Sequence, residues 1–162
     1  MTRNGYSNSR LAERLTTNKS EREAMTVTNK DTARRAIEEL DRRHEPAEEF
    51  YTKDSMTYML NNPPFDIHTY KTVHAPTFFS AFPDLIHNIE NVMEERDTVM
   101  LDIVCTGTHK GSFMGIEATD RQVSYRSVIF YDFVDGKISR TRGVYDQMGL
   151  LEQIGAKFVP SS

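Results

Sequence analysis

The residues best suited to do chemistry lie in two neighbouring strands that the pattern predicts over 123–134 and 137–145. Asp135 and Gly136 separate these strands, and this dipeptide is favoured where a two-residue hairpin turn needs positive φ. With regular pairing, Phe133 faces Ile138, Tyr131 faces Arg140, and alternate residues of both strands share one face of a sheet. That face would collect Tyr125, Ser127, Tyr131, Arg140, Arg142 and Asp146, together with Phe133, Ile138 and Val144. A mixed polar and apolar lining of this kind is typical of a ligand pocket.

Arg140 and Arg142 are unusual on a pocket face, because arginine is rarely buried without a partner. Either the face is partly solvated, or the arginines pair with an acid or an anionic ligand. Asp146 is one available acid, and an arginine beside it would lower its pKa. Asp146 also stands directly before an expected helix, where aspartate is a favoured N-cap. The pocket role and the capping role both stay open.

Tyr70 and His74 lie on one apolar helical face and are expected to point into the interior. His74 is then either a hydrogen-bonded core histidine or a residue that orients a substrate. Tyr58, in an expected strand over 55–60, could donate a hydrogen bond to a substrate carbonyl.

Two other histidines carry weaker signals. His109 stands at the end of an expected strand beside a glycine-containing turn, where a turn or surface position is the usual reading. His68 and His74 are too far apart in sequence for the i, i+3 or i, i+4 spacing of two ligands on one helix, so we expect no metal site.

The composition bounds the class of protein. A chain of 162 residues with 38% hydrophobic and 27% charged residues predicts one soluble folded domain. The net charge of −4 argues against a nucleic-acid partner. Cys105 is the one cysteine, which excludes an internal disulfide and favours a reducing compartment, the cytoplasm by default. The sequence contains no apolar run of about 20 residues and no secretory signal at its start, so neither a membrane partner nor export is expected.

The first half of the chain has helical patterning. Residues 1–25 are polar and are expected to form a flexible extension, leaving 26–162 as the single domain. Asp31 offers an N-cap for a helix over 32–43, a short helix is expected after Pro46, and a helical segment over 67–82 is restarted or kinked at Pro76.

The second half has strand patterning that ends in a helix. Val99, Leu101, Ile103 and Cys105 alternate with more polar residues, which predicts one thoroughly apolar sheet face. A closing helix over 147–154 should end at Gly155. Helices followed by consecutive strands and a last helix indicate the α+β class.

Two stretches resemble the SnoaL-like polyketide cyclase family, within the nuclear-transport-factor-two-like superfamily. One runs from Ala-Phe-Pro-Asp to Gly-Thr-His-Lys-Gly-Ser-Phe-Met-Gly-Ile within 81–123, and the other from Asp-Gly-Lys-Ile to Gly-Leu-Leu-Glu-Gln-Ile-Gly within 135–155. The likeness extends over approximately 29–158. Arg96 and Asp120 stand at turn positions where the family commonly has glycine, and Arg96 should need a different turn type. Arg140 and Arg142 replace residues that are often Glu and Trp in the family.

The resemblance implies a fold and an activity. The fold would be a cone-shaped α+β barrel, with a curved mixed or antiparallel sheet wrapped by N-terminal helices. The activity would be cofactor-independent aldol cyclisation of an aromatic or polycyclic polyketide-like metabolite in secondary metabolism, with neither a metal nor a Schiff base. Asp146 matches the family's acid/base residue, and burial in an apolar cone would raise its pKa toward the working range. The substrate-binding residues expected with it are Tyr58, Tyr70, His74, Tyr125, Ser127, Tyr131 and Arg142.

The superfamily leaves other functions open. A hydratase, an epoxide hydrolase or an isomerase acting on a small hydrophobic substrate could use the same cone, as could a non-catalytic ligand-binding module. An epoxide hydrolase would need Arg142, Asp146 and Asp132 in one place, whereas regular pairing puts Asp132 on the opposite face. The resemblance also implies a homodimer or a higher homo-oligomer.

Overall fold

The computed structural model describes residues 27–60 and 62–157, so the expected extension over 1–25 lies outside the described residues. The fold is the expected α+β cone. A six-stranded curved sheet has the order β2-β1-β6-β5-β4-β3. Its strands are β1 (Tyr51–Met59), β2 (Phe65–Asp66), β3 (Ile86–Glu95), β4 (Thr98–Thr108), β5 (Gln122–Val134) and β6 (Lys137–Tyr145). All neighbouring pairs are antiparallel except β1 and β6, which are parallel.

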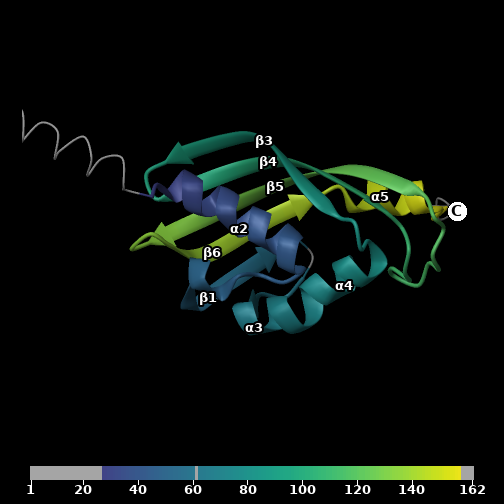
Figure 1. The fold of residues 1–162 in the computed structure, drawn as a ribbon, viewed down its shortest axis with the longest axis horizontal. Helices are drawn as coiled ribbons and strands as arrows, with labels where there is room; N and C mark the ends of the chain where they lie inside the picture. The colour runs from purple at the N-terminus through teal and green to yellow at the C-terminus, as the bar shows by residue number, and fades with distance from the viewer. Residues whose placement is uncertain (1–26, 61, 158–162) are drawn as a thin grey trace, which may run out of the picture.

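The helices of the first half of the chain gather on the inner face of the sheet (Figure 1). Helix α2 (Asn29–Arg43) packs against β3 and β4, and a helical path formed by α3 (Ile67–Thr69), the π-turn η2 (Tyr70–His74) and α4 (Ala75–Ala81) follows β2. A short 3₁₀ turn, η1 (Glu48–Phe50), leads into β1, where the sequence predicted a helix. The last helix, α5 (Gln147–Ile154), packs against β5 and ends at Gly155, as expected.

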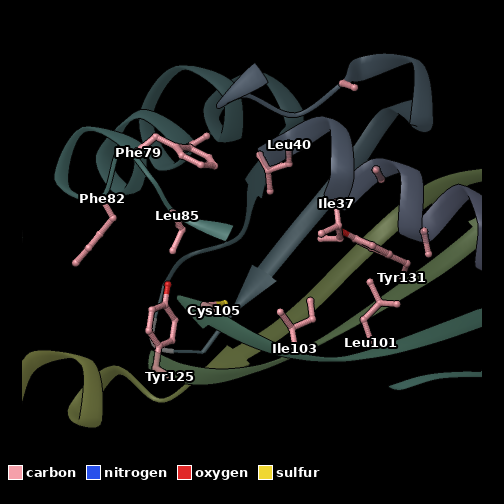
Figure 2. Packing of buried hydrophobic residues seen from close by; sticks show 14 of the residues in the cluster. Ile37, Leu40, Phe79, Phe82, Leu85, Leu101, Ile103, Cys105, Tyr125 and Tyr131 are labelled. Carbon is pink, nitrogen blue, oxygen red and sulfur yellow. The ribbon is translucent and has the colours of Figure 1, made fainter. Parts of the chain in front are cut away.

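The core fills the space between α2, α4 and the inner face of the sheet. Val99, Leu101, Ile103 and Cys105 are at most 1% exposed, which confirms the apolar face predicted for this strand. Figure 2 shows Leu40 of α2 and Phe79 of α4 on the helical side of the core, with Tyr125 below Leu85 and Tyr131 below Ile37 on the sheet side. Polar side chains that line this interior therefore stand in a largely apolar, water-poor setting.

The predictions for the turns and caps at the ends of the elements are confirmed in part. Asp135 and Gly136 both have positive φ, as the predicted hairpin turn requires. The N-cap of α2 is Thr28 rather than Asp31; Asp31 is the third helical residue and completes a capping box with Thr28. Arg96 adopts the left-handed conformation at φ 55°, so the expectation of a different turn type was wrong.

A β-bulge in β6 changes the strand register that the sequence suggested. Phe133 faces Ile138 as predicted, but Ser139 is the extra residue of the bulge, so Asp132 faces Arg140 and Tyr131 faces Thr141. A one-residue slip moves every later side chain to the other face. Arg140, Arg142 and Val144 are consequently on the outer face of the sheet, and the prediction that they share the pocket face was wrong.

Candidate active site

A cavity of about 120 Å³ lies between the helices and the inner face of the sheet. Its apolar wall comes from residues such as Leu40, Phe78, Phe79, Leu85 and Ile129. Its polar lining consists of Thr57, Asn62, Tyr70, His74, His87, Cys105, Tyr125, Ser127, Tyr131, Thr141 and Tyr145. An apolar cavity with a small number of converging polar groups is the usual form of a ligand site.

A buried ion pair between Asp41 of α2 and His87 of β3 lies at this cavity. His87 Nδ1 lies 2.5 Å from Asp41 Oδ1, and the His87 backbone N–H donates to Asp41 Oδ2 at 2.9 Å. Both side chains are 13% exposed. Burial alone lowers the pKa of His87, but the hydrogen bonds with Asp41 and Cys105 outweigh it and raise the pKa to about 10. The ring is therefore an imidazolium at neutral pH.

Cross-strand pairing places this pair beside two more polar groups. His87 faces Cys105 on β4, and Cys105 faces Tyr125 on β5, so the three form one row across the sheet. The hydroxyl of Tyr125 points from the sheet toward the helices (Figure 2). Burial, followed by its contact with Cys105, raises the pKa of Tyr125. This tyrosine stays protonated and can donate a hydrogen bond.

A second histidine reaches the cavity from the helical wall. The π-turn inserts an extra residue into the helical path, and both Tyr70 and His74, at its two ends, line the cavity. The His74 ring stacks on Phe65, with centroids 3.8 Å apart. Burial lowers the pKa of His74, so the ring is neutral near pH 7 and can accept a proton.

The remaining tyrosines of this interior are held in their neutral form. Burial raises the pKa of Tyr51, Tyr70 and Tyr131. These groups can donate hydrogen bonds, but a tyrosinate base is excluded near neutral pH. No aspartate or glutamate is among the described residues that line the cavity. The titratable side chains among the described lining residues are therefore the two histidines, Cys105 and the tyrosines.

The structure divides the predicted site residues into two groups. Tyr70, His74, Tyr125, Ser127 and Tyr131 all line the cavity. Tyr58 and Arg142 do not, because both belong to the outer face, where Tyr58 pairs with Arg142 in the register between β1 and β6. Tyr58 is 42% exposed. The structure therefore does not bring these two residues together with the other five, and the bulge at Ser139 explains the position of Arg142.

Asp146 lies at the start of α5, outside the cavity lining. Its carboxylate accepts a hydrogen bond from the Gly149 backbone N–H at 2.9 Å and so caps the helix, which confirms the capping role. The residue is exposed, so the predicted burial in an apolar cone was wrong.

The arginines of β6 have a different partner from the one considered first. Asp132 binds Arg140 Nε at 2.5 Å and Arg142 Nη2 at 2.9 Å, and Arg142 also lies over the Phe130 ring. Burial alone raises the pKa of Asp132, but hydrogen bonds from Thr98 and Arg140 outweigh it and lower the pKa. This cluster is on the outer face, away from the cavity.

Sequence reasoning missed Asp41 and His87, although each left a signal. Asp41 follows Ile37 by four residues and so continues the apolar stripe of α2, where an acid is out of place. His87 lies opposite Cys105, which the alternation had already put on the buried face. His109, expected at a turn or the surface, is fully buried; its Nδ1 lies 3.0 Å from Thr119 Oγ1, and it does not line the cavity.

Within the described residues, no three His, Cys, Asp or Glu side chains are grouped so that they could hold a metal ion. Over the same residues, no helix is both long and apolar enough to cross a membrane.

Comparison with known proteins gives a family and a set of similar structures. The sequence model described as SnoaL-like polyketide cyclase matches residues 31–154. AclR from Streptomyces galilaeus, a candidate hydroxylase, is 28% identical, with a TM-score of 0.71 over 82% of this chain and 85% of its own. A candidate SnoaL-like polyketide cyclase from Jannaschia sp. CCS1 is 22% identical, with a TM-score of 0.71 over 80% of this chain and 93% of its own.

IdmH from Streptomyces antibioticus, a candidate polyketide cyclase, is also 22% identical, with a TM-score of 0.69 over 80% of this chain and 99% of its own. At this identity the last two structures show a shared fold. Comparison with curated protein sequences gives no match.

Proposed function

Because the chain belongs to the SnoaL-like polyketide cyclase family, we propose that it closes a ring in an aromatic polyketide-like substrate by acid/base chemistry of the intramolecular aldol type. The observation that carries this proposal is a pair of histidines, His74 and His87, that line one cavity with pKa values shifted in opposite directions. When the environment lowers the pKa of one group and raises the pKa of another, a single site can supply both a base and an acid at neutral pH.

His74 is the proposed base. Burial keeps its ring neutral, so a ring nitrogen is free to take a proton from the carbon next to a substrate carbonyl. Stacking on Phe65 fixes the plane of the ring. A base that is already oriented loses little entropy when the substrate arrives.

His87 is the proposed acid. Asp41 holds it as an imidazolium, so it can stabilise and then protonate the oxygen on which negative charge develops. Tyr125, one strand beyond Cys105 in the same row, can donate a second hydrogen bond to that oxygen. A fixed cation in a water-poor site acts more strongly than the same charge in water.

The proposed step is balanced without a cofactor. The enolate carbon attacks a second carbonyl carbon of the same molecule, a carbon–carbon bond forms, and the carbonyl π bond becomes an alkoxide. His74 has gained one proton and His87 delivers one to the alkoxide, so the product is an isomer of the substrate. Exchange with solvent returns both rings to their starting state. The same two groups could shift a double bond, and only product analysis separates cyclase from isomerase.

The cavity size limits the buried part of the substrate. Its volume of about 120 Å³ is slightly less than that of an engineered cavity of ~150 Å³ that admits benzene. We therefore propose that one aromatic ring with its oxygen substituents enters the cone, and that any further rings lie toward its mouth.

Incorporation of deuterium into an aromatic β-keto ester in deuterated buffer tests the proposal. Mass spectrometry follows both this exchange and the formation of product. His74→Gln should slow enzyme-dependent exchange by about 100-fold or more, the usual contribution of a general base. His87→Gln should slow ring closure. Asp146→Asn is the matched control, because it removes a carboxylate that caps α5 outside the cavity.

The outcomes separate the candidates. Loss of exchange in Asp146→Asn with retention in His74→Gln would return the base to Asp146 and overturn this assignment. Saturable binding with no exchange above the buffer background would instead indicate a non-catalytic ligand-binding module. Thermal unfolding of each variant shows whether a loss reflects chemistry or folding.

A further inference from the structure

One buried hydroxyl in the cavity has no hydrogen-bond partner among residues 27–60 and 62–157, which the structure describes. Thr141 of β6 is 5% exposed and lines the cavity, and its Oγ1 forms no hydrogen bond with any described residue. Buried hydroxyl groups in folded proteins are almost always hydrogen-bonded, because leaving one unpaired costs free energy. A hydroxyl left free inside a ligand cavity is therefore explained by a group that the ligand brings.

Thr141 has a residue with a hydroxyl side chain on each neighbouring strand. Thr57 on β1 and Tyr131 on β5 face Thr141 from its two sides, both line the cavity, and they are 4% and 2% exposed. Hydroxyl groups can donate and accept, so the three suit a ligand oxygen of either kind. Phe65, on which His74 stacks, pairs with Thr57, so this row lies at the His74 side of the cavity.

Two other buried residues with hydroxyl side chains, Ser127 and Thr52, differ from Thr141 in their hydrogen bonding or in their position. The Ser127 hydroxyl also lines the cavity, but it already donates to the Val144 carbonyl at 3.1 Å. Thr52 has an unpartnered buried hydroxyl too, but it does not line the cavity. Among these residues, only Thr141 combines a free hydroxyl with a place in the ligand cavity.

We propose that Thr141 is a specificity-determining residue, which binds a phenolic or carbonyl oxygen on the ring that enters the cone. The inference rests on the proposed function in one respect, that the cavity is the substrate site. Hydrogen bonding at Thr141 fixes that oxygen beside His74. When the bound oxygen is a carbonyl oxygen, the base then meets the carbon next to that carbonyl, whose proton is acidic. An unoxygenated ring leaves the hydroxyl unpaired and is selected against.

Binding of phenol and of toluene, which have nearly the same shape, tests this directly. Both dissociation constants are measured by NMR titration of the full chain. Wild type should prefer phenol, and Thr141→Val should reduce the phenol affinity by about tenfold while leaving toluene affinity within about twofold. Thr141→Ser, which keeps the hydroxyl, should restore the preference. Thr52→Val is the matched control, because it removes a free hydroxyl outside the cavity and should leave the ratio unchanged.

A Thr141→Val protein that folds and still prefers phenol as wild type does overturns the inference. Failure of wild type to bind either probe overturns it as well. Failure of the proposed function looks different: wild type would then show no deuterium exchange, while the phenol preference and its loss in Thr141→Val would remain.

Discussion

Two clusters in which aspartate meets a cation lie on opposite faces of the sheet. On the inner face, Asp41 and His87 are both 13% exposed. On the outer face, Asp132 is 16% exposed, but its partners Arg140 and Arg142 are 53% and 43% exposed. The interatomic distances are similar, so the two clusters differ mainly in how far water reaches the cation.

This difference separates a water-poor pair from a solvated surface pair. Water and salt screen the arginines, so the outer cluster contributes little beyond its geometry. The inner pair lacks that screening, and each charge depends on the other. A cation kept in a dry cavity is also what acid catalysis requires. The inner pair thus joins the stability of the fold to the proposed chemistry, which the outer cluster does not.

Removing the inner carboxylate should have the largest effect. Asp41→Ala leaves a buried histidine without its counter-charge, and we expect a loss of about 3–5 kcal/mol in the free energy of unfolding. Urea denaturation followed by circular dichroism measures this. The double variant Asp41→Ala/His87→Leu should regain much of the loss, because no uncompensated charge remains. Equal stabilities of the single and double variants would contradict the idea of a charge-dependent pair.

The pH dependence of stability should reveal the same pair. The pKa of His87 is raised to about 10 in the folded protein from 6.5, so its stabilisation is fully present below about pH 6.5 and is lost as pH rises toward 10. One such group gives a slope of at most about 1.4 kcal/mol per pH unit. Urea titrations between pH 6 and 10 should show this decline in wild type. His87→Gln should remove it, and an unchanged slope in that variant would exclude His87 as the source.

The outer cluster should respond weakly to the corresponding change. Asp132→Ala removes the carboxylate that binds Arg140 and Arg142, but both cations are partly solvated, so we expect a loss of about 1 kcal/mol. Raising the salt concentration should narrow the gap between variant and wild type. A loss as large as that of Asp41→Ala would mean that the two clusters do not differ in the way argued above.

The sequence was sufficient for the fold class and for most of the elements, because these depend on local rules. Alternation marked the buried face of β4, Asp135 and Gly136 marked the hairpin, and Gly155 marked the end of α5. These patterns need no knowledge of distant neighbours. The motif resemblance then supplied the cone, which the family match over residues 31–154 confirms.

The site was harder to predict because it depends on register and on contacts between distant segments. Ser139 carries no signal that it is the extra residue of a bulge, yet it decides whether Arg142 meets the cavity or the outer face. Asp41 and His87 are far apart in the chain and meet only when α2 packs on β3. Tyr70 and His74 were placed correctly because one helical stretch carries both.

Deleting Ser139 should have the smallest effect, and it tests how the two faces are assigned. A deletion within a paired strand normally flips the residues beyond it to the other face. Ser139 is surplus, so its removal should restore regular pairing, keep Arg140 opposite Asp132 and leave Thr141 in the cavity. The cost is the hydrogen bond from Ser139 Oγ to the Asp132 carbonyl at 3.0 Å, about 0.5 kcal/mol.

Deleting Val128, an outward residue in a regularly paired stretch of β5, should by contrast prevent folding. The Ser139 deletion could instead unfold the protein, as the Val128 deletion does, or abolish phenol binding. Either result would mean that the bulge does more than set the register. The separation of a neutral inner face of β6 from a charged outer face would then depend on the twist that the bulge adds.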